Sequence, residues 1–143
     1  MARKEARPGA SVLRLLDANL NRAREGLRVL EDTARFLWQS KKHFQALRKA
    51  RHKLDTLTRR HYPDLVRSRS GAQDPGRRIK EGGRESLEEV VAANLRRCEE
   101  SLRVLEEYGK IFSANAGAEF KDLRYAIYDL EKSVFENGAI WKR

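Results

Sequence analysis

The 143-residue chain is long enough for one domain, and its composition favours helices, because 36% of the residues are charged while only 9 are glycine and 3 are proline. A single cysteine, Cys98, excludes an internal disulfide, and the lack of a long apolar stretch argues against a membrane span, so we expect a cytoplasmic protein. The net charge of +10 indicates an anionic partner, without choosing between nucleic acid, a membrane surface and phosphorylated metabolites.

The first predicted helix covers residues 11–39, with Ser11 placed to cap its N-terminus. Leucine and alanine recur along it every three or four residues, which is typical of a helix in a bundle. A neighbouring stripe is apolar at both ends and carries Asn19, Arg22 and Gly26 in its middle. A partly buried arginine needs an anionic partner, so this stripe predicts either a bound phosphate, with Gly26 leaving room for it, or an ion pair with another helix.

The second predicted helix covers residues 41–60, and its apolar stripe can be drawn in two registers. In one register Arg51 lies in the seam and faces a polar cavity, where it meets a phosphate or a carboxylate. In the other register the seam runs through Leu47, Ala50 and Leu54. The histidines recur at intervals of nine, which does not line one helical face, so we expect them on the surface.

Residues 61–85 hold two of the 3 prolines and four of the 9 glycines, which predicts a long crossover loop. Its basic side chains, among them Arg69, Arg77 and Arg78, make it a candidate clamp for phosphate. Asp74 lies in an Asp-Pro-Gly sequence, which is first of all a turn signal and only second a place for a magnesium ligand.

The second half of the chain repeats the first. Residues 92–112 match residues 17–37 at 10 of 21 positions, and a second helical segment follows in each half. The repeat predicts helices at 86–112 and 116–136, the first of them capped by Ser86. Two tandem hairpins that pack together make an all-α four-helix bundle. We therefore expect a single domain over residues 1–143, with hairpin one at 11–60, the crossover loop at 61–85 and hairpin two at 86–136.

The polar residues of the first helix recur in the third. Asn94 and Arg97 repeat the asparagine and arginine of the first stripe, each 75 residues later. On the outer flank, Arg28 recurs as Arg103 and Glu25 recurs as Glu100. Most charges on such a flank only contact solvent, but their recurrence makes them candidates for function.

The segment DANLNRAREGLRVLEDTARF resembles the signature of the small hydroxymethylpyrimidine-phosphate kinase family of thiamine biosynthesis, and the crossover Asp-Pro-Gly and the second segment ANLRRCEESLRVLEEYGK extend the likeness along the chain. Members of that family occur alone or fused ahead of thiamine-phosphate synthase, which implies a functional link to that enzyme. Because the chain ends at Arg143, we expect a standalone version or an isolated domain. The resemblance implies a kinase that uses ATP and Mg²⁺ to convert the pyrimidine monophosphate into its diphosphate.

Phosphoryl transfer to an ionised phosphate depends on charge neutralisation and alignment more than on a general base. We therefore expect the following roles: Arg22, Arg28, Arg97 and Arg103 as catalytic residues; Asn19, Arg51, Asn94 and Gly26 as substrate-binding residues; Arg69, Arg77 and Arg78 as the phosphate loop; and Glu25, Glu100 and Asp74 as metal ligands.

Two other functions compete with this interpretation. The second predicted helix is strongly basic, which would suit an RNA-binding or ribosome-associated module. A helical enzyme of the chorismate-mutase type, which uses arginines to bind carboxylates, is a third alternative. The sequence leaves the oligomeric state open, with a homodimer among the alternatives.

Overall fold

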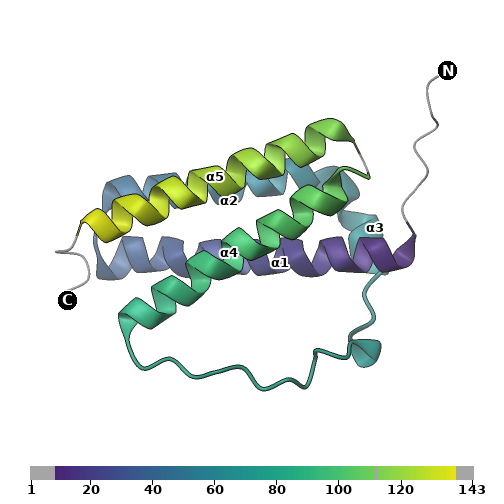
Figure 1. The fold of residues 1–143 in the computed structure, drawn as a ribbon, viewed down its shortest axis with the longest axis horizontal. Coiled ribbons are helices and arrows are strands. Elements are labelled where there is room, and N and C mark those ends of the chain that lie inside the picture. Colours follow the sequence, from purple (N-terminus) through teal and green to yellow (C-terminus); the bar gives the residue numbers. More distant parts are fainter. Residues whose placement is uncertain (1–8, 112, 138–143) are drawn as a thin grey trace.

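The computed structural model describes residues 9–111 and 113–137, and the regular structure of these residues is entirely helical (Figure 1). Its elements are α1 (Ala10–Asp32) with a π-helical extension (Thr33–Leu37), α2 (Lys41–Thr58) with a 3-10 turn (Arg59–His61), α3 (Tyr62–Arg67), a second 3-10 turn (Gly71–Gln73), α4 (Leu87–Gly109) and α5 (Ala114–Glu136). None of the helices in this part of the chain is long and apolar enough to cross a membrane.

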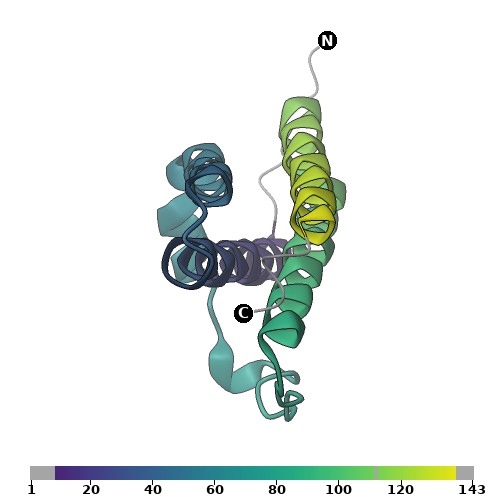
Figure 2. The same cartoon turned by 90° about the vertical axis from the view of Figure 1, so that its left-hand side faces the viewer.

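The four long helices form two hairpins, α1–α2 and α4–α5, that pack through α1 and α4. In both views α2 and α5 lie on one side of the α1–α4 pair, and the crossover segment passes on the opposite side (Figures 1 and 2). This arrangement confirms the predicted all-α bundle of two tandem hairpins. Among the described residues, the other face of the α1–α4 pair has the crossover alone on its side (Figures 1 and 2).

The leucine seam of α1 is buried as predicted, with Leu27 and Leu30 each 1% exposed. The stripe ends earlier than the sequence suggests, because Leu37 is 55% exposed. The π-helical turn at Thr33–Leu37 inserts an extra residue into the helical repeat and rotates the residues after it. Trp38 consequently takes the buried position at the end of the helix.

The two predicted N-caps have different outcomes. Ser86 caps α4, since its Oγ accepts a hydrogen bond from the backbone N–H of Glu89 at 3.1 Å. The prediction for Ser11 is wrong: α1 begins at Ala10, Gly9 is the N-cap residue, and no side chain caps the helix. Ser11 lies inside the first turn.

The buried face of α2 settles its register in favour of the stripe through Leu47, Ala50 and Leu54. His43 belongs to this face and is only 1% exposed, so the expectation of a surface histidine is wrong there. Its ring nitrogens lie 2.8 Å from Ser40 Oγ and 3.2 Å from Ser133 Oγ, and the second contact joins α2 to α5. Burial lowers the pKa of His43, so the ring stays neutral in the core.

The predicted crossover loop contains one helix that the sequence reading missed. Helix α3 begins at Tyr62, has Pro63 in its first turn, and buries Leu65 against the bundle. Proline is tolerated in a first turn because its missing N–H has no intrahelical acceptor there, so it did not exclude a helix. The irregular part of the crossover is therefore shorter than predicted and begins after Arg67.

Candidate functional site

The site lies where α1 crosses α4, and the closeness of that crossing depends on Gly26. A Cβ atom at Gly26 would lie 2.8 Å from the Sγ of Cys98 and 3.4 Å from the backbone oxygen of Asn94. The space beside Gly26 is thus filled by α4 rather than by a ligand, and its predicted role in substrate binding is wrong. Cys98 is a core residue, and burial raises the pKa of its thiol to about 12.

The two asparagines face this crossing but bond to their own helices. The Nδ2 of Asn19 donates to Leu15 O at 2.9 Å, and the Nδ2 of Asn94 donates to Val90 O at 2.8 Å. Each amide is thereby held in a fixed orientation, with its Oδ1 atom left as an acceptor. Arg22 uses the Oδ1 of Asn19 through a long hydrogen bond of 3.4 Å.

A cleft of about 480 Å³ opens between α1 and α4, and we call it the α1–α4 cleft. Its lining consists of Asn19, Arg22, Glu81, Ala93, Arg96, Arg97, Glu100, Ser101 and Val104. It brings together the predicted residues Asn19, Arg22, Arg97 and Glu100. Arg97 makes only a 3.5 Å contact with Glu81, a glutamate whose side chain is 69% exposed, so an anionic ligand can replace that partner.

A second cleft, of about 810 Å³, lies between α1 and the crossover, and we call it the crossover cleft. Asn19, Arg22 and Val104 line both clefts, so the two adjoin at the middle of α1. The crossover contributes Arg69 and Asp74, two more of the predicted residues. Asp74 also accepts a 2.8 Å hydrogen bond from Gly76 N, which confirms the predicted turn.

Arg69 is fixed at this position by Asp17 of α1. Its Nε lies 2.7 Å and its Nη2 3.1 Å from the two carboxylate oxygens of that aspartate. Asp17 is 7% exposed, so the pair anchors the start of the crossover against the bundle. Arg77 and Arg78 are exposed and line neither cleft, so their role in closing over a phosphate stays a prediction.

The predicted role of Arg51 in phosphate binding disagrees with its contacts. Its guanidinium makes two hydrogen bonds to Glu31, a carboxylate that is 2% exposed, and this is the ion pair between helices that the sequence also allowed. In the second repeat Glu106, the equivalent of Glu31, accepts two hydrogen bonds from Arg124, both at Oε2. Arg51 is a structural residue that neutralises a buried acid.

Arg28 and Arg103 lie on the outer flank, each paired with two acids of its own helix and each with a side chain that is 54% exposed. Neither lines the α1–α4 cleft or the crossover cleft. Both arginines make the same ion pairs within their own helix, as expected for charges on a solvent-exposed flank. Arg103 also lines a separate cleft of about 630 Å³, which it shares with Glu100 and Arg124. A catalytic role for them stays a prediction.

The three predicted metal ligands are spread over the molecule. Glu100 lines the α1–α4 cleft, Asp74 lines the crossover cleft, and Glu25 is exposed and lines neither. Among the residues described, no group of three or more acidic, histidine or cysteine side chains is arranged to hold a metal ion. A magnesium ion that arrives with a nucleotide needs only one or two protein carboxylates, because the phosphates supply the other ligands.

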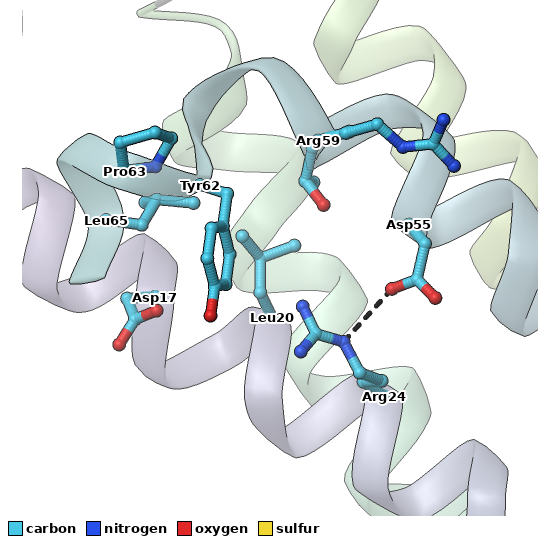
Figure 3. A pocket seen from close by; sticks show the side chains of 9 residues that line it. Asp17, Leu20, Arg24, Asp55, Arg59, Tyr62, Pro63 and Leu65 are labelled. Atoms are coloured by element: carbon cyan, nitrogen blue, oxygen red, sulfur yellow. Dashed lines mark ion pairs between the residues drawn. The ribbon is translucent and has the colours of Figure 1, made fainter.

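Sequence reasoning missed a third cleft, of about 410 Å³, enclosed by α1, α2 and α3. We call it the tyrosine cleft; it is lined by Asp17, Leu20, Arg24, Asp55, Thr58, Arg59, Tyr62, Pro63 and Leu65 (Figure 3). Arg24 Nε and Asp55 Oδ1 form an ion pair of 3.0 Å at one end. One signal in the sequence could have indicated this cleft. The repeats differ in charge at one of its positions, because Arg24 corresponds to Glu99, while Asp55 corresponds to another acid, Glu131.

In the second repeat the positions of Arg24 and Asp55 are both held by acids, Glu99 and Glu131. Burial raises the pKa of Glu99 to about 8, and the hydrogen bond and negative charge of Glu131 act in the same direction. Glu99 is 8% exposed and therefore carries a proton at neutral pH. The two repeats thus share a fold but differ in charge at equivalent positions.

Comparison with known proteins gives one family. The model of the ThiD2 family matches residues 14–133. The chain is 44% identical to a thiamine-phosphate synthase of Synechococcus sp. (strain CC9605) over 84% of its own length and 34% of the relative's, and 40% identical to that of Nostoc punctiforme over 86% and 35%. For the thiamine-phosphate synthase of Thermosynechococcus vestitus the identity is 39%, over 92% of this chain and 38% of the relative. The chain spans about a third of the length of these relatives. No solved structure matches it.

Proposed function

This chain belongs to the ThiD2 family, and we propose that it acts in thiamine biosynthesis as an ATP-dependent kinase that converts hydroxymethylpyrimidine monophosphate into the diphosphate. The relatives named thiamine-phosphate synthase support the pathway, and the likeness of the α1 segment to pyrimidine-phosphate kinases supports the reaction. A working link to thiamine-phosphate synthase is part of the proposal.

The observation that carries the proposal is the position of Arg22 and Arg97. Both line the α1–α4 cleft, to which the crossover contributes Glu81. Neither has a buried carboxylate as its partner, in contrast to Arg51 and Arg124. Arginines that lack strong partners in a cleft are suited to bind a ligand with several negative charges.

The reaction needs little covalent chemistry from the protein. The attacking oxygen belongs to the monophosphate and is already ionised at neutral pH, so no strong base is required. Arg22 and Arg97 would neutralise the charge of the reacting phosphates, and Asn19 would orient Arg22. Arg69, held by Asp17, would bring a third guanidinium from the crossover cleft.

Magnesium fits this site only as a companion of the nucleotide. Four carboxylates line the two clefts, and two of them, Asp17 and Glu81, are paired with Arg69 and Arg97. The other two, Glu100 and Asp74, would complete the coordination of a phosphate-bound ion. When bound, the ion would supply positive charge between the phosphates. Arg97 and Glu100 both belong to α4, so this helix brings a basic and an acidic group into the same cleft.

The proposal is tested by incubating the purified protein with ATP, magnesium and the pyrimidine monophosphate and following phosphorus NMR. We expect diphosphate to form from the monophosphate, while free hydroxymethylpyrimidine is left unchanged, because Arg22 and Arg97 require an existing phosphate. Phosphorylation of the free alcohol, or no transfer to the monophosphate, would reject this specificity.

The basic surface of α2 is the one observation that favours RNA binding instead. Lys42, Arg48, Lys49 and Lys53 are all exposed on it. Such a surface would bind RNA with an affinity that falls steeply as salt rises and without ATP turnover. Titration of a short RNA at two salt concentrations separates this function from the kinase.

A further inference from the structure

The tyrosine cleft has the features of a binding site for a flat ring. Tyr62 is 55% exposed and presents an aromatic face at the start of α3, opposite Arg24 and Asp55 (Figure 3). Leu20, Leu65 and Pro63 supply apolar surface around it. The volume of about 410 Å³ falls within the ordinary range for small-molecule sites.

The polar end of the cleft offers an acceptor beside a donor. Only the Nε of Arg24 is engaged with Oδ1 of Asp55, at 3.0 Å. Figure 3 shows the terminal nitrogens of Arg24 pointing away from that contact, toward Leu20 and Tyr62. The second oxygen of Asp55 points to the other side of the contact, so Oδ1 is the acceptor that lies nearest to these nitrogens (Figure 3). A carboxylate oxygen can accept more than one hydrogen bond, so Oδ1 and the terminal nitrogens of Arg24 present an acceptor and donors to a ligand beside Tyr62.

The repeat shows that this combination is particular to the first half of the chain. The second repeat keeps the leucine of the floor, as Leu95 in place of Leu20, but replaces Arg24 and Asp55 with Glu99 and Glu131. Burial and the neighbouring carboxyl keep one of those acids protonated. Both repeats form the same helical hairpin, so the hairpin does not require the pair of Arg24 and Asp55.

We propose that the tyrosine cleft binds an amino-substituted pyrimidine ring, stacked on Tyr62 and read by Asp55 and Arg24. Such a ring carries an exocyclic amino group next to a ring nitrogen, which are a donor and an acceptor in adjacent positions. The amino group would donate to Asp55, and the ring nitrogen would accept from Arg24. Adenine and the aminopyrimidine of the phosphorylated substrate both have this edge.

The ring site adjoins the proposed phosphate site. Asp17 lines both the tyrosine cleft and the crossover cleft, and it holds Arg69 at their boundary. In this proposal a ring in the tyrosine cleft has its phosphate on the Asp17 side, next to Arg69 and the crossover cleft. This inference rests on the proposed function for the identity of the ligands, but the ring contacts stand on the cleft itself.

The test compares ligands that have a ring with ligands that lack one. Binding of ATP, of the pyrimidine monophosphate and of inorganic pyrophosphate is measured by calorimetry for the wild type, Tyr62→Ala and Tyr125→Ala. Tyr125 is the matched control, because it is 52% exposed on α5 and lies outside the cleft. Loss of a stacking partner should weaken ring binding about tenfold in Tyr62→Ala and leave pyrophosphate binding unchanged.

The ligand that loses affinity in Tyr62→Ala identifies the bound ring. A loss for ATP means that the cleft binds the adenine of the phosphoryl donor, and a loss for the monophosphate means that it binds the pyrimidine of the phosphoryl acceptor. Either result supports the site. Unchanged affinity for both ring ligands, or an equal loss in Tyr125→Ala, would overturn it. Asp55→Asn adds a test of the edge contact, since it should reduce the preference for ATP over inosine triphosphate, which lacks the amino group. If Tyr62→Ala weakens ring binding while the wild type transfers no phosphate, the ring site stands and the kinase proposal fails.

Discussion

The guanidinium of Arg51 is joined to the carboxylate of Glu31 by two contacts, with Nε 2.6 Å from Oε2 and Nη2 3.2 Å from Oε1. The pair connects α2, which carries Arg51, to α1, which carries Glu31. Burial alone would raise the pKa of Glu31, but the hydrogen bonds and charge of Arg51 outweigh it and hold the pKa below its ordinary value. The acid is thus ionised inside the bundle and depends on its arginine.

Removal of that arginine should destabilise the fold. Arg51→Ala leaves an ionised, buried Glu31 without its main partner, and we expect the free energy of unfolding to fall by about 3 kcal/mol. Lys49→Ala, an exposed residue of the same helix, is the control and should change it little. Urea unfolding measures both. If Arg51→Ala keeps its stability but no longer binds substrate, Arg51 has the substrate-binding role that the sequence predicted.

The Glu99–Glu131 pair makes stability depend on pH in the opposite sense to an ordinary ion pair. The folded pKa of about 8 exceeds the reference value of 4.5, so between these values the folded state binds more protons than the unfolded state. Stability should therefore decline as pH rises from about 4.5 to about 8. Glu99→Gln should flatten this decline, whereas Glu88→Gln, at an exposed position in the first turn of the same helix, should not. Thermal unfolding between these pH values decides, and an unchanged slope in Glu99→Gln would contradict the assignment.

The contact between Gly26 and Cys98 predicts a pair of coupled substitutions. Gly26→Ala puts a methyl group 2.8 Å from the sulfur, and overpacking should cost about 1–3 kcal/mol, partly offset by the better helix propensity of alanine. In a Cys98→Ala background the sulfur is gone, so the same change should cost little. Equal losses in both backgrounds, measured by urea unfolding, would show that the two residues do not limit the helix crossing.

The fold was largely predictable because its signals are local and repeated. The leucine stripes of α1 and α5 fixed which faces are buried, and the repeat fixed the pairing of hairpins. The errors occurred where tertiary contacts override local pattern. The π-helical turn removes Leu37 from the seam, and His43 is buried because Ser40 and Ser133 satisfy its ring nitrogens.

The site was predictable only in part, because a sequence shows which arginines are near the core but not which carboxylates they meet. Asn19, Arg22 and Arg97 do line one cleft. Arg51 instead forms an ion pair with Glu31, and the sulfur of Cys98 fills the space beside Gly26. The tyrosine cleft needs α3, a helix that lies within the segment read as a loop. Its residues could not be grouped without knowing that α3 packs on α1.

Phosphoryl transfer in the α1–α4 cleft requires Arg22 and Arg97 to act on the ligand phosphates. The rate of diphosphate formation by Arg22→Ala and by Arg97→Ala, each prepared separately, measures this requirement. Lys132→Ala, which removes an exposed positive charge from α5, serves as the control. We expect each arginine variant to unfold like the wild type and to lose about 100-fold in turnover, since each removes a charge that stabilises the transferred phosphoryl group. Unchanged turnover in both variants would contradict the central claim that the α1–α4 cleft is the site of phosphoryl transfer.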